Sequence, residues 1–251
     1  MSSVINFADK AINQKTKKAV ILLALLSISA FAQGTFTDSR DGKKYKSVKI
    51  SKQTWMAQNL DYQGDDGNLG KCYEDKPENC KKYGRLYNWA EAMNIDAKFN
   101  KEKWEGDTSD VKHQDVCPSG WHLPNTTEWE TLVNFAGGKN EDVEKKLKDA
   151  GKKLKAKSGW NPPPTLVNQN KSAVNGTDNY GFSALPGGLG DPRGSFNWIG
   201  YDGYWWSSSS RSRYNGGYYR DRGELLEMDY SSPKIEEEDR SKMFSVRCVK
   251  D

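Results

Sequence analysis

Two short runs of alternating apolar and polar residues lie at 45–50 (YKSVKI) and 53–60 (QTWMAQNL). A period of two residues places every second side chain on the same face of a strand. Ser51 and Lys52 separate the runs and supply a polar turn. The pattern therefore predicts a β-hairpin.

The spacing of the apolar residues then becomes helical. Within 84–94 (GRLYNWAEAMN), Leu86, Trp89, Ala90 and Met93 recur at i, i+3, i+4 and i+7, which predicts a short helix. The polar and irregular residues that follow, up to Asp115, are expected to form an exposed insertion.

A second helix is expected just beyond this insertion. Asn125 or Thr127 can cap its first turn, because Glu128 and Glu130 lie three positions further along and complete a capping box. The pair 137–138 (GG) ends the helix. Its apolar face consists of Trp129, Leu132, Val133 and either Phe135 or Ala136.

The remaining chain changes from helical to strand-like texture. A highly charged helix is predicted over 141–150 and ends at Gly151, and a strand is predicted at 154–160 before a proline run stops regular structure. Further strands are expected at 181–188, 203–209, 216–222, 224–230 and 243–249. Two or three short helices placed early and strands placed late predict an α+β fold with antiparallel sheets and a long loop region.

The first residues carry the pattern of an export signal. Three lysines precede the uncharged run 19–32 (AVILLALLSISAFA), which is shorter than the roughly 20 apolar residues of a membrane-spanning helix. The run ends in a small-x-small sequence that signal peptidase recognises, so we predict a signal peptide over 1–32 with cleavage near Ala32. Residues 33–40 are expected to be flexible, and 41–251 to form a single domain.

The mature chain is expected to be exported to the extracellular space, the cell surface or the periplasm. No later stretch is apolar enough to cross a membrane, so we expect no membrane span in the mature chain. The predicted signal peptide holds four lysines and one aspartate, which leaves about +1 of the total charge of +4 on the mature chain. A near-neutral chain gives no electrostatic reason to expect a nucleic-acid partner.

Four cysteines remain in the mature chain, and an even number in an exported protein predicts two disulfides. Three connectivities are open. Cys72 and Cys80 flank a short polar loop, which favours a local bridge and leaves Cys117 to pair with Cys248. The long bridge is expected to contribute the larger part of the stabilisation.

His122 is the candidate for a catalytic or metal-binding role, within 116–132 (VCPSGWHLPNTTEWETL). A metal site needs three or four donors, and the other histidine, His113, lies in a polar loop without ligand spacing. No nucleophile elbow, phosphate loop or dinucleotide fingerprint is present. We therefore interpret His122 as a packed side chain bonded to the backbone, and assign no catalytic residue and no metal ligand.

Several motifs together make the chain resemble a known family. Their order is WMAQNL at 55–60, CY…NC..YGRLYNWAEAM at 72–93, CPSGWHLPNTTEWETL at 117–132, AGKKLK…GW at 150–160, GFSALPGG at 181–188, YWWSSS at 204–209 and SVRCVKD at 245–251. This order resembles the Fibrobacter succinogenes major paralogous domain from about Asp41 to Asp251. That family is itself similar to the C-type-lectin-like fold and to formylglycine-generating sulfatase-modifying factors.

The resemblance implies an exported C-type-lectin-like domain with its termini brought together, and it brings no established activity. Formylglycine-generating enzymes hold a copper ion with two reactive cysteines in their C-terminal half. That half of this chain has only Cys248, which is expected to be locked in a disulfide and so to be unreactive. We therefore expect a protein that is not an enzyme.

Calcium is the one cofactor that we consider further, because lectin-like folds often bind it through carboxylate and amide side chains of their loops. Asp65, Asp66 and Asn68 gather within one glycine-bounded loop, and 236–239 (EEED) forms a second acidic cluster. Neither has the spacing of an EF-hand loop, and the sugar-binding tripeptides of C-type lectins are absent. Aspartate and asparagine are common in turns, which explains the first cluster, and the second cluster is explained as a solvent-exposed acidic segment. We therefore assign no cofactor.

The densest unusual feature is 196–222 (FNWIGYDGYWWSSSSRSRYNGGYYRDR), in which aromatic residues alternate with serine, asparagine, glycine and arginine. Such a mixture is typical of recognition surfaces, because rigid rings provide contact area and small polar residues provide hydrogen bonds. The candidate ligand-binding residues are Trp198, Tyr201, Tyr204, Trp205, Trp206, Tyr218, Tyr219 and Arg220. Of the adjacent tryptophans we expect one to be buried and the other to lie on a face or under a loop.

These features predict an exported, non-enzymatic surface domain that binds a polysaccharide or a cell-envelope partner through its aromatic and polar loops. The alternative is a structural or assembly protein of the envelope that makes protein–protein contacts.

Overall fold

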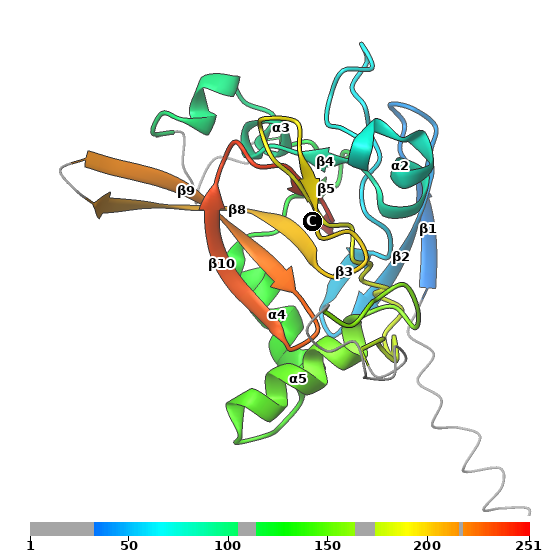
Figure 1. The fold of residues 1–251 in the computed structure, drawn as a ribbon. Helices are drawn as coiled ribbons and strands as arrows, with labels where there is room; N and C mark the ends of the chain where they lie inside the picture. The colour runs from blue at the N-terminus through cyan, green and yellow to red at the C-terminus, as the bar shows by residue number, and fades with distance from the viewer. Residues whose placement is uncertain (1–32, 105–113, 164–173, 216–217) are drawn as a thin grey trace, which may run out of the picture. The chain divides into compact units, whose positions relative to one another are not determined.

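The computed structural model describes residues 33–104, 114–163, 174–215 and 218–251 (Figure 1). The predicted signal peptide, 1–32, lies outside the described residues. Within them, strands and four short α-helices form an α+β arrangement in which most strand pairs are antiparallel. No helix of this described part is long and apolar enough to cross a membrane.

The first sheet brings the two ends of the domain together. Its strand order is β1-β2-β3-β12-β5, with β1 at Gln33–Thr37, β2 at Lys44–Ile50, β3 at Gln53–Met56, β12 at Val249–Lys250 and β5 at Trp121–His122. β2 and β3 form the predicted hairpin, and Val249 of β12 pairs with Trp55 of β3. Residues 33–37 were expected to be flexible, but they form β1 because β2 offers them a free antiparallel edge.

The second sheet has the order β10-β9-β8-β11-β4. Its strands are β10 at Pro233–Asp239, β9 at Tyr218–Met228, β8 at Gly203–Asn215, β11 at Phe244–Ser245 and β4 at Leu86–Tyr87. β8 and β9 extend beyond β10 as a two-stranded ribbon (Figure 1). A separate small ribbon pairs β6, Leu189–Gly190, with β7, Phe196–Asn197.

The strand predictions for this half of the chain need three corrections. The expected strands at 216–222 and 224–230 are one strand, β9, in their described part from Tyr218 to Met228, and 181–188 forms only isolated bridges. The last run is divided, because β11 joins the second sheet and β12 the first. The acidic run at 236–239 was not expected to be a strand, yet it pairs with β9 as part of β10.

The helices begin where side chains can cap their free backbone N–H groups. α3, Trp89–Met93, is capped by Asn88, and α4, Thr126–Gly137, is capped by Asn125. In both, a glutamate three positions on completes the capping box, here Glu91 and Glu128. α2, Pro77–Tyr83, begins with proline, and single 3-10 turns lie at Tyr73–Asp75 and Ala97–Asn100.

α5, Val143–Leu154, differs from its prediction because it continues through Gly151 instead of ending there. A Cβ atom at Gly151 would lie 3.1 Å from Cδ of Pro233, so the missing side chain lets the helix approach β10 closely. In place of the predicted strand at 154–160, Leu154 ends the helix and Lys155 forms a single bridge with Ala184. The predicted helix over 84–94 is also shorter, since Leu86 lies in β4.

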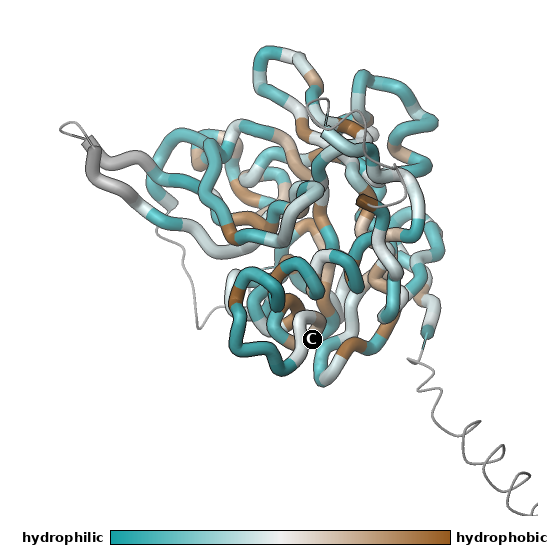
Figure 2. Tube along the Cα trace, turned by 60° about the horizontal axis from the view of Figure 1, so that its bottom comes forward, coloured by the Kyte–Doolittle hydropathy of each residue, from teal (hydrophilic) through white to brown (hydrophobic). Residues whose placement is uncertain are grey.

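The interior of the domain is built mainly from aromatic side chains. Seven tryptophans are buried, and the rings of Trp55 and Trp129 stack with their centroids 4.6 Å apart. Hydrophobic positions lie mostly inside the traced domain, while its peripheral loops are hydrophilic (Figure 2). On α4 it is Ala136 that faces the core, and Phe135 is 40 % exposed.

Both tryptophans of β8 are buried at 0 % exposure, which corrects the expectation that one would lie on a face or under a loop. Adjacent residues of a strand point to opposite faces, so both faces of β8 must be covered. Trp206 packs against Phe244 at a ring distance of 4.4 Å on one side. On the other side the indole N–H of Trp205 donates to Oδ1 of Asn59 at 2.8 Å.

Asn59 is the centre of a buried polar network that joins distant parts of the chain. Its Oδ1 also accepts hydrogen bonds from Nε and Nη2 of Arg247, at 2.9 and 2.6 Å. Its Nδ2 donates to the carbonyl oxygen of Tyr83 at 2.7 Å and to the hydroxyl of Ser245 at 3.2 Å. One amide side chain therefore satisfies buried polar groups of four residues from three segments of the chain.

Both predicted disulfides are present. Cys72 is joined to Cys80 and Cys117 to Cys248, and the structure describes no free cysteine. The second bridge lies in the main hydrophobic core and fastens the loop before β5 to the segment between β11 and β12.

Candidate functional site

His122 lies between two carboxylates, which corrects the expectation that it is bonded to the backbone. Its Nδ1 lies 2.6 Å from Oδ1 of Asp251, and its Nε2 lies 2.9 Å from Oε1 of Glu128. Burial would lower the pKa of His122, but the hydrogen bonds to Glu128 and Asp251 outweigh it and raise the pKa to about 9. A charged imidazole with both nitrogens engaged offers no lone pair to a metal or to a proton, so these contacts fasten β5 to α4 and to the last residue.

The raised pKa of His122 predicts a pH-dependent stability. The charged ring stabilises the fold fully below its ordinary pKa of 6.5, and this contribution is lost as the pH rises through about 9. We expect His122→Gln to lower the free energy of unfolding by about 1 kcal/mol in the acidic range, a small value because the ring is one-third exposed to solvent. Urea titrations across the pH range should show the difference vanish above pH 9, and a constant difference would contradict the ion pairs.

The acidic clusters have partners of their own. In the loop, Asp66 accepts hydrogen bonds from the backbone and side chain of Asn68 at 3.0 and 3.2 Å, and Asp65 accepts one from the hydroxyl of Tyr62. Within β10, Glu238 pairs with Lys242 at 2.8 Å. No group of three or more acidic, histidine or cysteine side chains among the described residues has the arrangement of a metal site.

A tight turn presents Trp198 to solvent between β7 and β8. The carbonyl oxygen of Trp198 accepts hydrogen bonds from the backbone N–H groups of Tyr201 and Asp202, at 2.9 and 3.0 Å. Trp198 itself has a φ of 68°, in the left-handed region that costs a non-glycine residue about 1–2 kcal/mol. Despite this conformation its side chain is 52 % exposed, so the strain is not offset by burying the ring.

The turn rests on a close backbone support. Gly188 donates to the carbonyl oxygen of Asp202, and Gly200 donates to that of Pro186, both at 2.9 Å. A Cβ atom at Gly188 would lie 2.4 Å from the carbonyl oxygen of Asn197 and 2.6 Å from the nitrogen of Ile199. Only glycine allows the two segments to approach so closely, and the indole of Trp198 is consequently carried on a well-fixed base.

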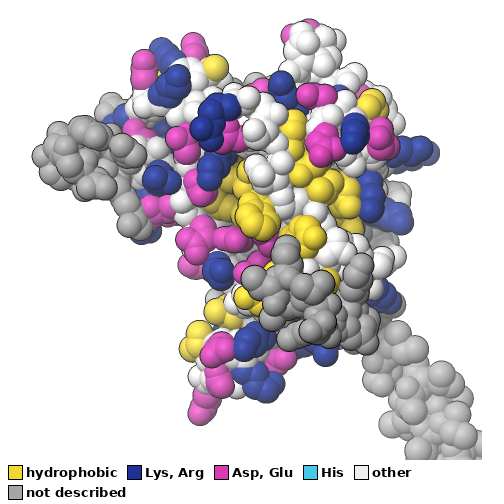
Figure 3. Space-filling model, viewed as in Figure 1, with side chains coloured by type: hydrophobic (Ala, Val, Ile, Leu, Met, Phe, Trp, Pro, Cys, Tyr) yellow, Lys and Arg dark blue, Asp and Glu magenta, His cyan; other side chains and the backbone are white. Residues whose placement is uncertain are grey.

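Further aromatic and acidic side chains lie around this turn. Tyr204 is half-buried, stacks on Phe244 with ring centroids 5.2 Å apart, and donates its hydroxyl to Oδ2 of Asp202 at 3.2 Å. Tyr201 is also half-buried, and Tyr230, which follows β9, is 49 % exposed. Hydrophobic side chains gather over the loops that lead into β8, with acidic side chains bordering them on the side of β10 (Figure 3).

The acidic members of this region influence one another. Burial raises the pKa of Asp202 and of Glu227, and the charge of Asp229 adds to the effect on both. Burial acts in the same direction on Asp229, but hydrogen bonds from Ser231 outweigh it and lower its pKa. Lys234 is the basic side chain that favours the charged form of all three carboxylates. We refer to Trp198, Tyr201, Asp202, Tyr204, Glu227, Asp229 and Tyr230 together as the aromatic surface.

The structure brings together only part of the predicted binding set. Trp198, Tyr201 and Tyr204 lie on the aromatic surface, whereas Trp205 and Trp206 are fully buried and cannot contact a ligand in this conformation. This corrects their assignment as ligand-binding residues, and the cause is the packing on both faces of β8. The side chains of Tyr218, Tyr219 and Arg220 lie outside the described residues.

Sequence reasoning missed Tyr230 and the carboxylates of the aromatic surface. Tyr230 is the last residue of the run 224–230 (ELLEMDY), and the turn residues 231–233 (SSP) follow it directly. A position where a strand passes into a turn indicates that the tyrosine side chain is exposed. Glu227 lies opposite Tyr204 in the β8–β9 register, which the sequence alone does not give.

Comparison with known protein families gives a match over most of the chain. The model of the Fibrobacter succinogenes major domain matches residues 48–250, a range that includes the second sheet, the aromatic surface, and the first sheet apart from β1 and the start of β2. No curated protein and no solved structure matches the chain.

Proposed function

The chain belongs to the Fibrobacter succinogenes major domain family, and for this member we propose a non-enzymatic function, the binding of a neutral polysaccharide by the aromatic surface outside the cytoplasm. The observation that carries this proposal is the strained and exposed position of Trp198. Trp198 is half exposed and has a left-handed backbone conformation, and four backbone hydrogen bonds hold the turn that carries it. This conformation lowers the stability of the fold. Ligand contact supplies a reason for that cost.

Sugar rings suit the chemistry of this surface. The flat indole of Trp198 provides a contact for the C–H face of a pyranose, and the carboxylates of Asp202 and Glu227 accept hydrogen bonds from hydroxyl groups. Because a fixed turn carries the ring, little conformational entropy is lost on binding. The surrounding negative charge repels anionic chains, which is why the proposed ligand is neutral.

Export and the finer fold form part of the same proposal. Two disulfides are typical of oxidising compartments, which supports the predicted export of the chain. The pairing of β12 with the N-terminal hairpin, together with the Cys117–Cys248 bridge, supports a C-type-lectin-like arrangement with joined termini.

Retention on insoluble polysaccharide tests the proposed ligand. We expect the mature chain to be retained on cellulose, on unsubstituted xylan or on both, with the anionic polymer peptidoglycan as a comparison, and Trp198→Ala to weaken the retention on the neutral material roughly 30-fold, as for a tryptophan at the centre of an interface. Tyr230→Ala should weaken it less, because its ring lies at the margin. Affinity is measured by depletion from solution over a range of polysaccharide amounts.

Phe135→Ala is the matched control, since Phe135 is an exposed aromatic residue on α4, away from the aromatic surface. Its retention should equal that of the wild-type chain. Failure of the wild type to bind either neutral material, cellulose or xylan, would contradict the proposal. A protein partner recovered by crosslinking on intact cells, in that case, would favour the alternative role in envelope assembly.

A further inference from the structure

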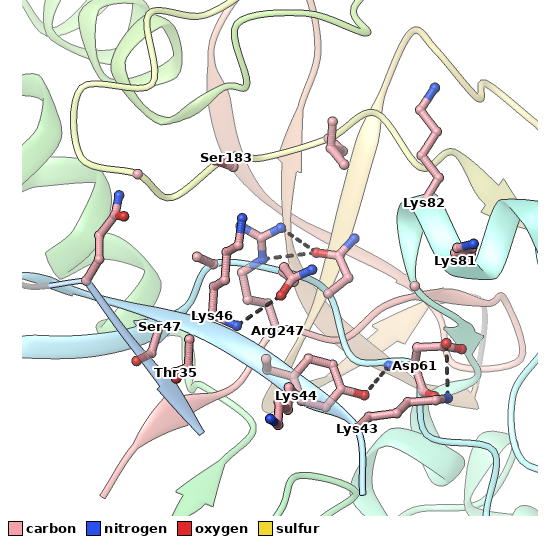
Figure 4. Close-up of a pocket in the computed structure, with 18 of the residues that line it drawn as sticks. Thr35, Lys43, Lys44, Lys46, Ser47, Asp61, Lys81, Lys82, Ser183 and Arg247 are labelled. Atoms are coloured by element: carbon pink, nitrogen blue, oxygen red, sulfur yellow. Dashed lines mark hydrogen bonds and ion pairs between the residues drawn. The ribbon is translucent and has the colours of Figure 1, made fainter. Parts of the chain in front are cut away.

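A large pocket lies at a different place in the domain, beside the first sheet. It has a volume of about 790 Å³, within the range of about 300–1,000 Å³ that ligand sites occupy. Its walls come from β1, β2, the loop after β3, the end of α2 and the segment 178–185 (Figure 4). None of its lining residues belongs to the aromatic surface.

The lining of this pocket is strongly basic, although the mature chain is nearly neutral. Its carboxylates are Asp61 and Asp178. Asp61 is already paired with Lys43 at 3.0 Å and with Arg85 at 3.3 Å. The cationic lining residues are Lys43, Lys44, Lys46, Lys81, Lys82 and Arg247. We call this cavity the basic pocket.

Most of these cations have no carboxylate to neutralise them. Among the residues that the structure describes, the ion pairs include none at Lys44, Lys46, Lys81 or Lys82. Lys44 and Lys46 project from β2, and Lys81 and Lys82 come from α2 on the facing wall (Figure 4). Like charges on two walls of one cavity repel one another, and an anion bound between them would relieve that repulsion.

Arg247 adds a fixed charge to the lining. Its side chain is fully buried, and its guanidinium group is held by Asn59 Oδ1 and by the carbonyl oxygen of Phe182, both of which are neutral acceptors. Burial lowers the pKa of Arg247 to about 9, which leaves the group charged at neutral pH. A buried cation whose hydrogen-bond partners are neutral keeps the local potential of the pocket positive.

Neutral polar groups complete the lining. The hydroxyl groups of Thr35, Ser47 and Ser183 and the amides of Gln33 and Gln58 lie among the lysines. Such groups suit the hydroxyls of a sugar, whereas a single inorganic anion would need only a few donors and a far smaller cavity.

We propose that the basic pocket binds an acidic oligosaccharide, a short sugar chain that carries carboxylate groups. The lysines of β2 and α2 would contact the carboxylates, and the hydroxyl and amide side chains would contact the ring hydroxyls. This site takes an anionic glycan, whereas the aromatic surface takes a neutral one, so the proposal gives the protein two distinct glycan-binding sites.

Titration calorimetry with trigalacturonate tests this proposal on the mature chain. We expect binding that weakens as sodium chloride is raised from about 50 to about 500 mM, since salt screens charge pairs. Lys46→Gln combined with Lys82→Gln should weaken binding roughly 30-fold, because each substitution removes one charged contact. The matched control combines Lys49→Gln with Lys52→Gln, two exposed lysines outside the pocket that carry the same change of charge.

Four results would overturn the proposal. They are no binding of trigalacturonate, equal binding of neutral maltotriose, an equal loss in the control variant, and binding of inorganic phosphate as tight as that of trigalacturonate. The last would indicate a simple anion site. Trp198→Ala should leave trigalacturonate binding unchanged, and the Lys46/Lys82 variant should keep its retention on neutral polysaccharide, so failure of one site is distinguishable from failure of the other.

Discussion

Replacing both Cys117 and Cys248 with alanine is expected to lower the free energy of unfolding by about 5 kcal/mol. The bridge closes a segment of 131 residues, and in the chain-entropy model the stabilisation grows with the logarithm of that length. Both sulfur atoms also lie in the main hydrophobic core, so their removal leaves a small cavity. Urea unfolding without reductant, followed by tryptophan fluorescence, measures the change.

The Cys72–Cys80 bridge provides an internal comparison. It closes only 8 residues, so its double alanine variant is expected to lose about 2.5 kcal/mol in the same assay. Equal losses from the two variants would show that loop length does not decide the contribution of the bridges. A fold that lies within about 5–10 kcal/mol of unfolding would survive loss of the short bridge more readily than loss of the long one.

Asn59→Leu is expected to lower the free energy of unfolding by about 4 kcal/mol, the second large effect. Leucine has nearly the same size, but it leaves the indole N–H of Trp205, the carbonyl oxygen of Tyr83 and two nitrogens of Arg247 without this partner. The largest part of the cost comes from the guanidinium group, because a buried charge that loses its hydrogen bonds is strongly destabilising.

Asn59→Asp distinguishes the hydrogen bonds that Asn59 accepts from those that it donates. A carboxylate still accepts from Trp205 and Arg247 and pairs with the guanidinium charge, but it cannot donate to Tyr83. We expect this variant to lose about 1–2 kcal/mol, at most half of the loss in Asn59→Leu. If leucine costs less than about 1 kcal/mol in urea unfolding, the polar network does not support the junction of the two sheets.

Local features of this fold could be predicted wherever a few neighbouring residues satisfy the backbone by themselves. Asn125 and Glu128 close a capping box, so the start of α4 followed from their spacing. The β2–β3 hairpin followed from two alternating runs around a short polar turn. The disulfide pairing followed because Cys72 and Cys80 are near neighbours and the other two cysteines were then left for each other.

Burial on the far side of a strand could not be predicted in the same way. Alternation shows that Trp205 and Trp206 point to opposite faces, but it does not show which elements cover each face. The cover comes from Asn59 and Arg247 on one side and from Phe244 on the other. Gly151 was misread for a similar reason, since its role depends on Pro233 in a strand more than eighty positions away.

The functional candidates depend even more on long-range placement. His122 meets Asp251 across 129 positions, so its raised pKa could not be read from its neighbours in the sequence. The basic pocket gathers lysines from β2 and α2 around Arg247 of the C-terminal segment, and the sequence alone does not bring these three distant segments together. Trp198 could be predicted from the sequence, because aromatic residues mixed with glycine and asparagine have the composition of a recognition loop.

A glycan array gives the most direct test of where binding resides, with the wild-type chain, Trp198→Ala and His122→Gln applied in parallel. We predict that the wild type binds at least one neutral glycan, that Trp198→Ala loses this signal, and that His122→Gln keeps it, because His122 serves only to fasten β5 and α4. An array on which the wild type binds no neutral glycan, or on which His122→Gln loses the signal as fully as Trp198→Ala, would contradict binding by the aromatic surface.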